Sequence, residues 1–390
     1  MATAWKAGLE DVVAARSAIT SIDGERGRLY YRGYEIGALT ARVPFEAVTS
    51  LLWFGALPEP DEAAGFAARL QAARSLPGGV DALLERIPLA SHPLDVLRTA
   101  VSFVASVDPD TSRVDREANV RKCERLMGLI PAVVSAWHRR RSGQPSLPPR
   151  DDLSHAAHFL YALTGHAPTP EAARLMDAVL TLHADHEFNA STFALRVAVA
   201  TMADLHAAMV AAIATLKGPR HGGANEDVLA MLREIGDPAR ARSFVEARLA
   251  AREGLSKGER GDPKSRVPGF GHRVYRVDDA RARVLRGMAR TVAEATGRIR
   301  LFEVAERVYE TVTSKTGLPV NVDFFSAVVY DALEIPPDLC TSIFAVGRVA
   351  GWCAHALEQY ADNRLIRPRA DYTGVAPRPL AEAATSLAAG

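Results

Sequence analysis

The stretch Gly218–Glu226, with the sequence GPRHGGANE, separates two helical patterns. Before it, apolar and small residues from Ser191 to Lys217 predict one long buried helix, and a fresh amphipathic pattern starts at Val228. His221 is therefore expected in a tight turn between two helices, beside glycines that let a ligand approach closely because they lack a Cβ atom. Taken alone, this histidine fits a helix-capping role as well as it fits a functional site.

Composition limits the kinds of partner that this chain of 390 residues is expected to bind. A hydrophobic content of 48% and a charged content of 24% are typical of soluble globular proteins with a substantial core. The formal net charge of +1 gives no reason to expect nucleic acid or a membrane surface as a partner. Three widely spaced cysteines without metal-binding spacing (Cys123, Cys340 and Cys353) predict a reducing, cytoplasmic location.

After one short β signal, the chain has a helical pattern. Ser17–Asp23 and Arg28–Arg32, joined by a glycine-containing turn, predict a hairpin. The apolar stretch Val197–Leu216 holds Asp204 and His206, which favours a buried helix over a transmembrane span. Helical periodicity is found at Phe45–Leu52, Ala63–Leu76, Leu94–Val104, Val120–Trp137, Leu153–Leu163, Ala172–Leu182, Asp279–Ala295, Leu301–Thr313, Asp323–Leu333 and Pro337–Tyr360. The predicted fold class is all-α with a small N-terminal β-hairpin.

A long stretch without helical pattern runs from Gly254 to Arg276, and loops of this length are usually functional or disordered. Gly269 and Gly271 begin like a dinucleotide-binding fingerprint, but the third glycine and a preceding strand are missing, so we reject that interpretation. Backbone amides and cations around His272 could instead hold a ligand that bears a phosphate or an adenine. The candidate cations are Lys264, Arg266, Arg273 and Arg276.

Asp323 opens a helical pattern and is followed by two phenylalanines. An acidic residue at a helix start is ordinarily explained by the helix dipole. A carboxylate beside aromatic rings can also be desolvated, which raises its basicity toward that of a general base. Both interpretations stay open from this stretch alone.

Other common chemistries lack their motifs. His183 and His186 could share one helix face, but no cysteine or third histidine follows at ligand spacing, so no metal site is expected. The phosphate-binding P-loop is absent from the sequence.

Several ordered motifs are spread over nearly the whole chain. The N-terminal part contains Gly8–Val13, Tyr31–Tyr34 and Leu52–Pro58. The remainder contains Asp185–Phe193, Gly218–Glu226, Pro268–Tyr275, Asn321–Ser326 and Asn363–Arg369. Together these motifs resemble citrate synthase of the short prokaryotic type.

The resemblance implies a homodimer of helical subunits, each with two domains that close over a cleft. Residues 1–221 and 326–390 would form the large domain, and residues 222–325 the small one. The implied reaction condenses acetyl-CoA with oxaloacetate and then hydrolyses the citryl thioester, with no cofactor.

The resemblance also implies roles for individual residues. Asp323 would remove the acetyl α-proton, His221 would donate to the thioester oxygen, and His272 would donate to the ketone of oxaloacetate. The implied dicarboxylate ligands are His186, Arg281, Arg348 and Arg367, the last reaching in from the other subunit. The implied CoA contacts are Lys264, Arg266, Gly269, Phe270, Gly271 and Arg273.

The sequence departs from the family's pattern in places. Asp279-Ala280-Arg281 stands where the family has Asp-Pro-Arg, Gly347 precedes Arg348 where serine is common, and the segment Gly254–Arg266 is longer than usual. Two alternatives to citrate synthase stay open: a 2-methylcitrate synthase that uses propionyl-CoA, and a catalytically silent paralogue that binds CoA or a dicarboxylate.

Overall fold

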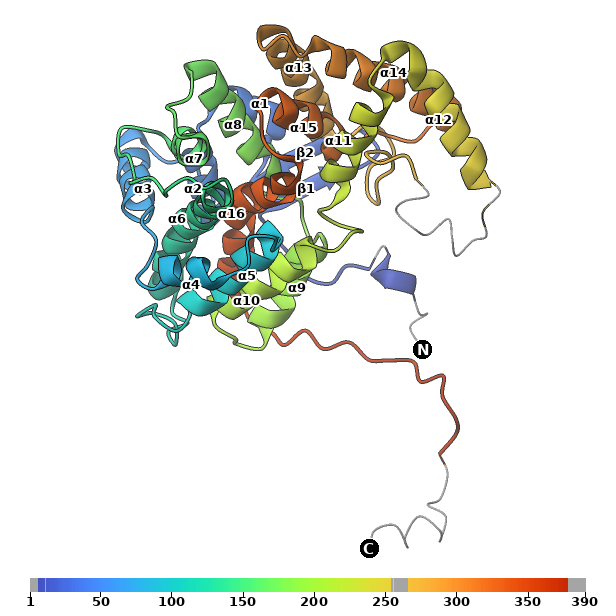
Figure 1. Cartoon of the computed structure of the whole chain (residues 1–390). Coiled ribbons are helices and arrows are strands. Elements are labelled where there is room, and N and C mark those ends of the chain that lie inside the picture. Colours follow the sequence, from blue (N-terminus) through green and yellow to red (C-terminus); the bar gives the residue numbers. More distant parts are fainter. Residues whose placement is uncertain (1–5, 11, 254, 256–265, 378–390) are drawn as a thin grey trace, which may run out of the picture.

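The computed structural model describes residues 6–10, 12–253, 255 and 266–377. As predicted, the fold is all-α, with one small sheet near the N-terminus (Figure 1). The first helices are α1 (Ile36–Arg42), α2 (Phe45–Phe54), α3 (Pro60–Ala72), α4 (Val80–Arg86), α5 (Pro93–Val104), α6 (Arg116–Arg141), α7 (His155–Thr164) and α8 (Pro170–His183), preceded by the 3₁₀ turn η1 (Ala7–Leu9). The helices that follow are α9 (Ala190–Ala200), α10 (Leu205–Leu216), α11 (Ala224–Ile235), α12 (Pro238–Glu253), α13 (Ala280–Ala295), α14 (Ile299–Thr316), α15 (Val322–Ala332), the 3₁₀ turn η4 (Pro337–Leu339) and α16 (Cys340–Ala361).

The predicted hairpin is confirmed and carries a third, very short strand. Strand β1 (Thr20–Asp23) pairs antiparallel with β2 (Arg28–Tyr31), and β2 pairs with β3 (Tyr34–Glu35). Alternate side chains of β2, Leu29 and Tyr31, are fully buried, so one face of the ribbon packs on the helices.

The single long helix expected from Ser191 to Lys217 is wrong. The structure divides it into α9 and α10, because Met202 adopts a positive φ of 65° and Asp204 caps the next helix by accepting the backbone N–H of Ala207 at 2.9 Å. The apolar content of both helices concealed this break. The sequence patterns also did not single out α1, α4 or α12; in α12 only Ala241 and Val245 are buried, which leaves a weak apolar stripe.

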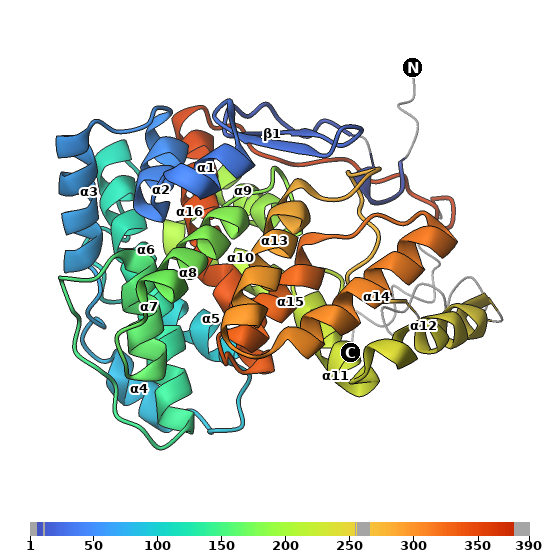
Figure 2. The same cartoon turned by 90° about the horizontal axis from the view of Figure 1, so that it is seen from above.

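Helices α11 to α15 pack mainly on one another, with α13 against α15, α12 against α14, and α11 against α15. Asn225 of α11 donates a 2.8 Å hydrogen bond to the buried hydroxyl of Ser326 in α15. In both views this group lies on the side of the molecule away from α3 and α7, with α16 between them (Figures 1 and 2).

Helix α16 is a central helix of the fold and supports the candidate site. It packs against α2, α6, α8, α9 and α10, and most of its residues are buried. Among the described residues, no helix is both long and apolar enough to cross a membrane.

The chain after α16 leaves the helical body as an extended segment (Figure 1). Asn363 anchors its start by donating a 3.2 Å hydrogen bond to the carbonyl of Ala200. Beyond this point most residues to Ala376 are exposed, including Leu365 and Tyr372.

Candidate active site

His221 lies in the turn between α10 and α11, as predicted. The turn is tight: the N–H of Gly222 donates to the carbonyl of Leu216 at 3.0 Å, and a Cβ at Gly222 would lie 2.5 Å from that oxygen. The Nε2 atom of His221 accepts the backbone N–H of Ser191 at 3.3 Å and lies 2.9 Å from the Ser191 hydroxyl. A ring nitrogen that accepts a backbone N–H carries no proton, so the neutral imidazole has its proton on Nδ1.

His272 lies in the loop before α13 and has the opposite tautomer. Its Nδ1 atom accepts the backbone N–H groups of Val274 at 2.9 Å and Tyr275 at 3.1 Å. The ring proton of the neutral imidazole therefore lies on Nε2. The two histidines thus offer different nitrogens as donors, and in each case the backbone fixes the choice.

The N-terminal hairpin supports the loop of His272 from outside. The carbonyl of Gly24 accepts the backbone N–H of Arg276 at 3.0 Å. A Cβ at Gly24 would lie 2.3 Å from the carbonyl oxygen of Val274, so the hairpin turn and the loop touch without room for a side chain.

His186 lies in the turn between α8 and α9, where the next residue, Glu187, has a positive φ of 49°. Its ring centroid is 5.2 Å from that of His272 and 5.6 Å from that of Tyr275. The Nε2 atom of His186 is buried and has no hydrogen-bond partner in the part of the chain that the structure describes. It is therefore available to a ligand.

Two buried guanidinium groups supply positive charge. Arg281, at the start of α13, pairs with Asp279 through two hydrogen bonds of 3.0 and 2.6 Å. Arg348, on α16, donates from Nε to the carbonyl of His183 at 2.7 Å and lies over the ring of Phe344 at 4.7 Å. Its Nη1 atom is buried and, within residues 6–377 as far as described, has no partner. A buried cationic donor without a partner favours an anionic ligand.

Asp323 occupies the first turn of α15, where the side chain of Asn321 caps the helix by accepting the Asp323 N–H at 3.1 Å. Burial raises the pKa of Asp323 to about 7, although the charges of Arg281 and Arg348 act in the opposite direction. The carboxyl group is thus poised to exchange a proton near neutral pH.

The imidazoles of the site are neutral at that pH. Desolvation lowers the pKa of His221 to about 4, and the charge of Arg348 adds to this effect. Desolvation likewise lowers the pKa of His272 to about 4 and that of His186 well below its usual value. The three rings therefore act as hydrogen-bonding groups rather than as cations.

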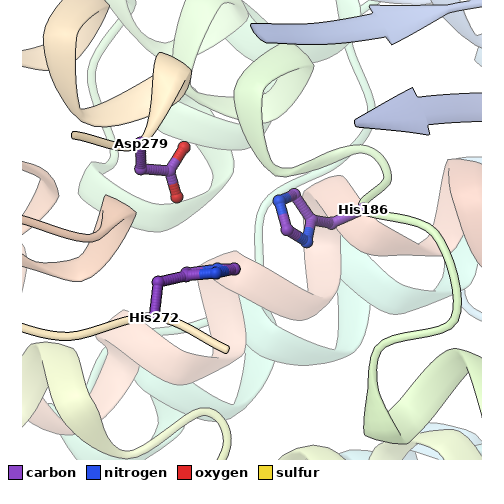
Figure 3. A group of neighbouring side chains, drawn as sticks. All are labelled: His186, His272 and Asp279. Atoms are coloured by element: carbon purple, nitrogen blue, oxygen red, sulfur yellow. The ribbon is translucent and has the colours of Figure 1, made fainter. Parts of the chain in front are cut away.

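His186, His272 and Asp279 come from three segments and face a common space (Figure 3). One ligand atom of each lies within 4.8 Å of the others, a set that could hold a cation. The carboxylate of Asp279 is already chelated by Arg281, however, and the charge of Arg281 acts on His186 and His272. The balance of charge favours an anion at this point.

Three of the expected CoA contacts, Gly269, Phe270 and Gly271, lie in the loop that carries His272. Gly269 and Gly271 have positive φ values of 84° and 86°, and a Cβ at Gly269 would lie 2.6 Å from the ring of Phe324. Phe270 is buried, with its ring centroid 4.8 Å from that of Phe324, while Arg273 is exposed. Arg266 is also exposed, and Lys264 lies outside the described residues.

Arg367 is not brought to this site within the subunit. It is exposed on the extended segment after α16, which leaves the helical body (Figure 1). The other candidate catalytic and dicarboxylate-binding residues come from three turns and three helices. The turns are those between α8 and α9, between α10 and α11, and before α13, and the helices are α13, α15 and α16.

The motifs and their surroundings contained residues of the candidate site that sequence reasoning did not single out. Ser191 lies in the motif Asp185–Phe193 and fixes the tautomer of His221, and Asp279 lies two residues before the arginine that it holds. The ring centroid of Tyr275 lies 4.7 Å from that of His272, and the buried hydroxyl of Tyr275 has no hydrogen-bond partner among the described residues. The motifs offered a signal for all three, but only the fold reveals their contacts.

Comparisons with known proteins agree with the resemblance. The family model described as citrate synthase, C-terminal domain, matches residues 8–369. Citrate synthase 2 of Bacillus subtilis is 43% identical over 368 residues, covering 94% of this chain and 95% of that protein. A 2-methylcitrate synthase of Shewanella oneidensis is 36% identical and covers 95% of this chain and 96% of its own length.

A solved structure shares the whole architecture. It is a ternary complex of carboxymethyl coenzyme A and oxaloacetate with citrate synthase from Thermoplasma acidophilum, with a TM-score of 0.86 and 31% identity over 97% of this chain and 98% of that one. Motifs, full-length sequence similarity and fold agree, and the chain belongs to the citrate synthase family.

Proposed function

We propose that the chain is a citrate synthase, which condenses the methyl carbon of acetyl-CoA with oxaloacetate and hydrolyses the citryl thioester to citrate and CoA. The proposal rests on where the titratable side chains of the site carry their protons. A carboxyl group with a pKa of about 7 shares the site with two neutral imidazoles whose donor nitrogens are fixed by backbone amides. This is the set that an enolisation followed by attack on a ketone requires.

In the first step, the carboxylate of Asp323 takes the weakly acidic α-proton of the acetyl group. The Nδ1–H of His221 donates to the thioester oxygen, on which negative charge develops as the proton leaves. Because the imidazole is neutral, it stabilises the enol or enolate through this hydrogen bond rather than as a cation.

In the second step, the Nε2–H of His272 donates to the ketone oxygen of oxaloacetate, which makes its carbon a better electrophile for the enol. The carboxylates of this dianion would pair with Arg281 and Arg348, since guanidinium groups bind carboxylates with paired hydrogen bonds. His186 would complete the set through its free Nε2 atom. Water then hydrolyses the citryl thioester, and no cofactor is required beyond the CoA substrate.

Closure of the small domain would exclude water during these steps. The proposed small domain, residues 222–325, begins just before α11 and ends within α15, so it comprises most of the group of helices that pack on one another. Its movement toward the large domain would shield the enol intermediate. Its exposed Arg266 and Arg273, with Lys264, would hold the CoA phosphates, and the backbone at Gly269–Gly271 would approach the CoA chain.

The complete site would contain two subunits. Arg367 lies on a segment that leaves its own helical body, as a residue that serves a neighbouring copy would. We propose a homodimer in which Arg367 binds a substrate carboxylate in the partner's cleft.

Steady-state rates with acetyl-CoA and with propionyl-CoA, each with oxaloacetate, test the proposal. We expect a higher kcat/KM for acetyl-CoA. A higher value for propionyl-CoA would assign the chain to 2-methylcitrate synthase, a name that its relative from Shewanella oneidensis carries. No turnover with either thioester, by a folded protein that binds oxaloacetate, would identify a silent paralogue.

A further inference from the structure

A buried chain of hydrogen bonds runs from the turn that carries His186 into α16. It begins at Asp185, whose carboxylate is fully buried and accepts the hydroxyl of Thr20 at 2.5 Å. The Nε2 atom of His355 lies 3.2 Å from both carboxylate oxygens. The main chain of Asp185 is held as well, since its N–H and its carbonyl both bond the hydroxyl of Tyr31, at 3.0 and 2.8 Å.

The tautomer of His355 follows from its second neighbour. Its Nδ1 atom lies 2.9 Å from Nη1 of Arg196. A guanidinium group can only donate, so Nδ1 must accept and the ring proton must lie on Nε2, facing Asp185. His355 is therefore a neutral donor to a buried carboxylate, and a second proton on Nδ1 would face a cation.

Arg196 is held in turn by groups at the edge of α16. Its side chain donates to Gln359 at 3.0 Å and to Glu358 at 2.7 Å, and it lies 4.7 Å above the ring of Phe188. The orientation of His355 thus has support on both sides. At its start, Asp185 directly precedes His186 in the sequence, and the negative charge of Asp185 acts on Arg348.

We propose that His355 is a positioning residue for the oxaloacetate site, acting through Asp185. Its hydrogen bond keeps the Asp185 carboxylate turned away from Arg348, so that the free Nη1 of Arg348 stays available to the substrate. It also fixes the turn from which His186 points into the site. Without this donor, the buried carboxylate would depend more on the positive charge of Arg348, which already acts on it, and would compete with the substrate carboxylate. The inference rests on the proposed function.

The test uses His355→Leu and His355→Gln in the full-length protein. Leucine removes the donor, whereas a glutamine side chain can place its amide nitrogen near the position of Nε2 and its oxygen near Arg196. We expect His355→Leu to raise the KM for oxaloacetate about 10- to 100-fold, the range for losing a hydrogen bond to a charged group. The KM for acetyl-CoA should stay unchanged, and His355→Gln should restore most of the oxaloacetate affinity.

The matched control is His155→Leu. His155 is also a buried histidine, on α7, and neither of its ring nitrogens has a partner in the described part of the chain. This variant should leave both KM values as they are. An equal rise of both KM values in His355→Leu, the absence of rescue by glutamine, or parental kinetics in His355→Leu would each overturn the inference. An inactive parental enzyme would instead reject the proposed function, so the two failures are distinguishable.

Discussion

The guanidinium of Arg281 chelates the carboxylate of Asp279, with Nε 3.0 Å from Oδ1 and Nη2 2.6 Å from Oδ2. The same Oδ1 atom accepts the backbone N–H of Arg281 at 2.9 Å and so caps α13. One aspartate thus fixes both the start of the helix and the direction of the arginine.

Asp279→Ala should therefore be strongly destabilising. Both side chains are buried, and loss of one partner leaves an uncompensated charge, which costs about 3–5 kcal/mol of the free energy of unfolding. The KM for oxaloacetate should rise as well, because Arg281 loses its orientation. Urea denaturation and steady-state kinetics check both effects. Glu306→Gln, which breaks the half-exposed pair with Arg286, is the control and should cost less than about 1 kcal/mol.

The second prediction concerns pH. Because Asp323 has a pKa of about 7, its basic form is lost as the pH falls through that value, and kcat/KM, which reports on the free enzyme, should decline toward acid pH. Asp323→Asn should lower kcat by at least ~100-fold, the lower end for loss of a general base, and should abolish the acid limb. Oxaloacetate binding should persist. A variant with near-parental turnover would contradict the role of Asp323.

The third prediction separates the two histidines by their donor nitrogens. An asparagine amide can replace the Nδ1–H of an imidazole, whereas a glutamine amide can replace its Nε2–H. His221→Asn should therefore retain more activity than His221→Gln, and His272→Gln should retain more than His272→Asn. Deuterium washout from labelled acetyl-CoA should fall in both His221 variants. If the order of the amides were the same at both positions, the tautomers assigned here would be wrong.

The fourth prediction concerns the subunits. Homodimers of Asp323→Asn and of Arg367→Ala should each be nearly inactive. After subunit exchange, one site of each heterodimer would contain both intact groups, and its activity should approach half that of a parental dimer. Mass spectrometry of differently tagged subunits verifies the exchange. No recovery in verified heterodimers would place Arg367 in its own subunit's site, or outside any site.

The fifth prediction concerns the hairpin. Gly24→Ala places a methyl group 2.3 Å from the carbonyl of Val274, so the loop of His272 must shift. Overpacking of this kind costs about 1–3 kcal/mol, and we expect the KM for oxaloacetate to rise. Gly78→Ala, at a turn with open space around the added methyl group, is the control. Equal kinetics in the two variants would exclude support of the loop by the hairpin.

The helices could largely be predicted because their apolar residues recur with the period of a helix that covers a core. The exceptions have physical reasons. Apolar residues continue on both sides of the turn at Met202, so periodicity does not reveal the break, and α12 buries too little to form a clear stripe.

The sequence could name the residues of the candidate site but not their contacts. The motifs named His221, His272 and Asp323, but the amides that fix the two tautomers depend on the path of the backbone. His355 gave no signal, since it reads as one polar residue on an apolar helix, and its partner Asp185 is 170 residues away in the chain. Only folding brings such groups together.

The guanidinium Nη1 of Arg348, which has no hydrogen-bond partner among the described residues, bears on the lifetime of the protein. Burying a cation without its full complement of acceptors opposes folding, and a dicarboxylate that supplies the acceptors removes that opposition. A ligand that binds only the native state adds RT ln(1 + [L]/Kd) to its stability, about 2.7 kcal/mol at a concentration of 100 Kd. Resistance to heat and to proteolysis would therefore follow the supply of oxaloacetate, and a cell starved of this metabolite would clear the protein sooner.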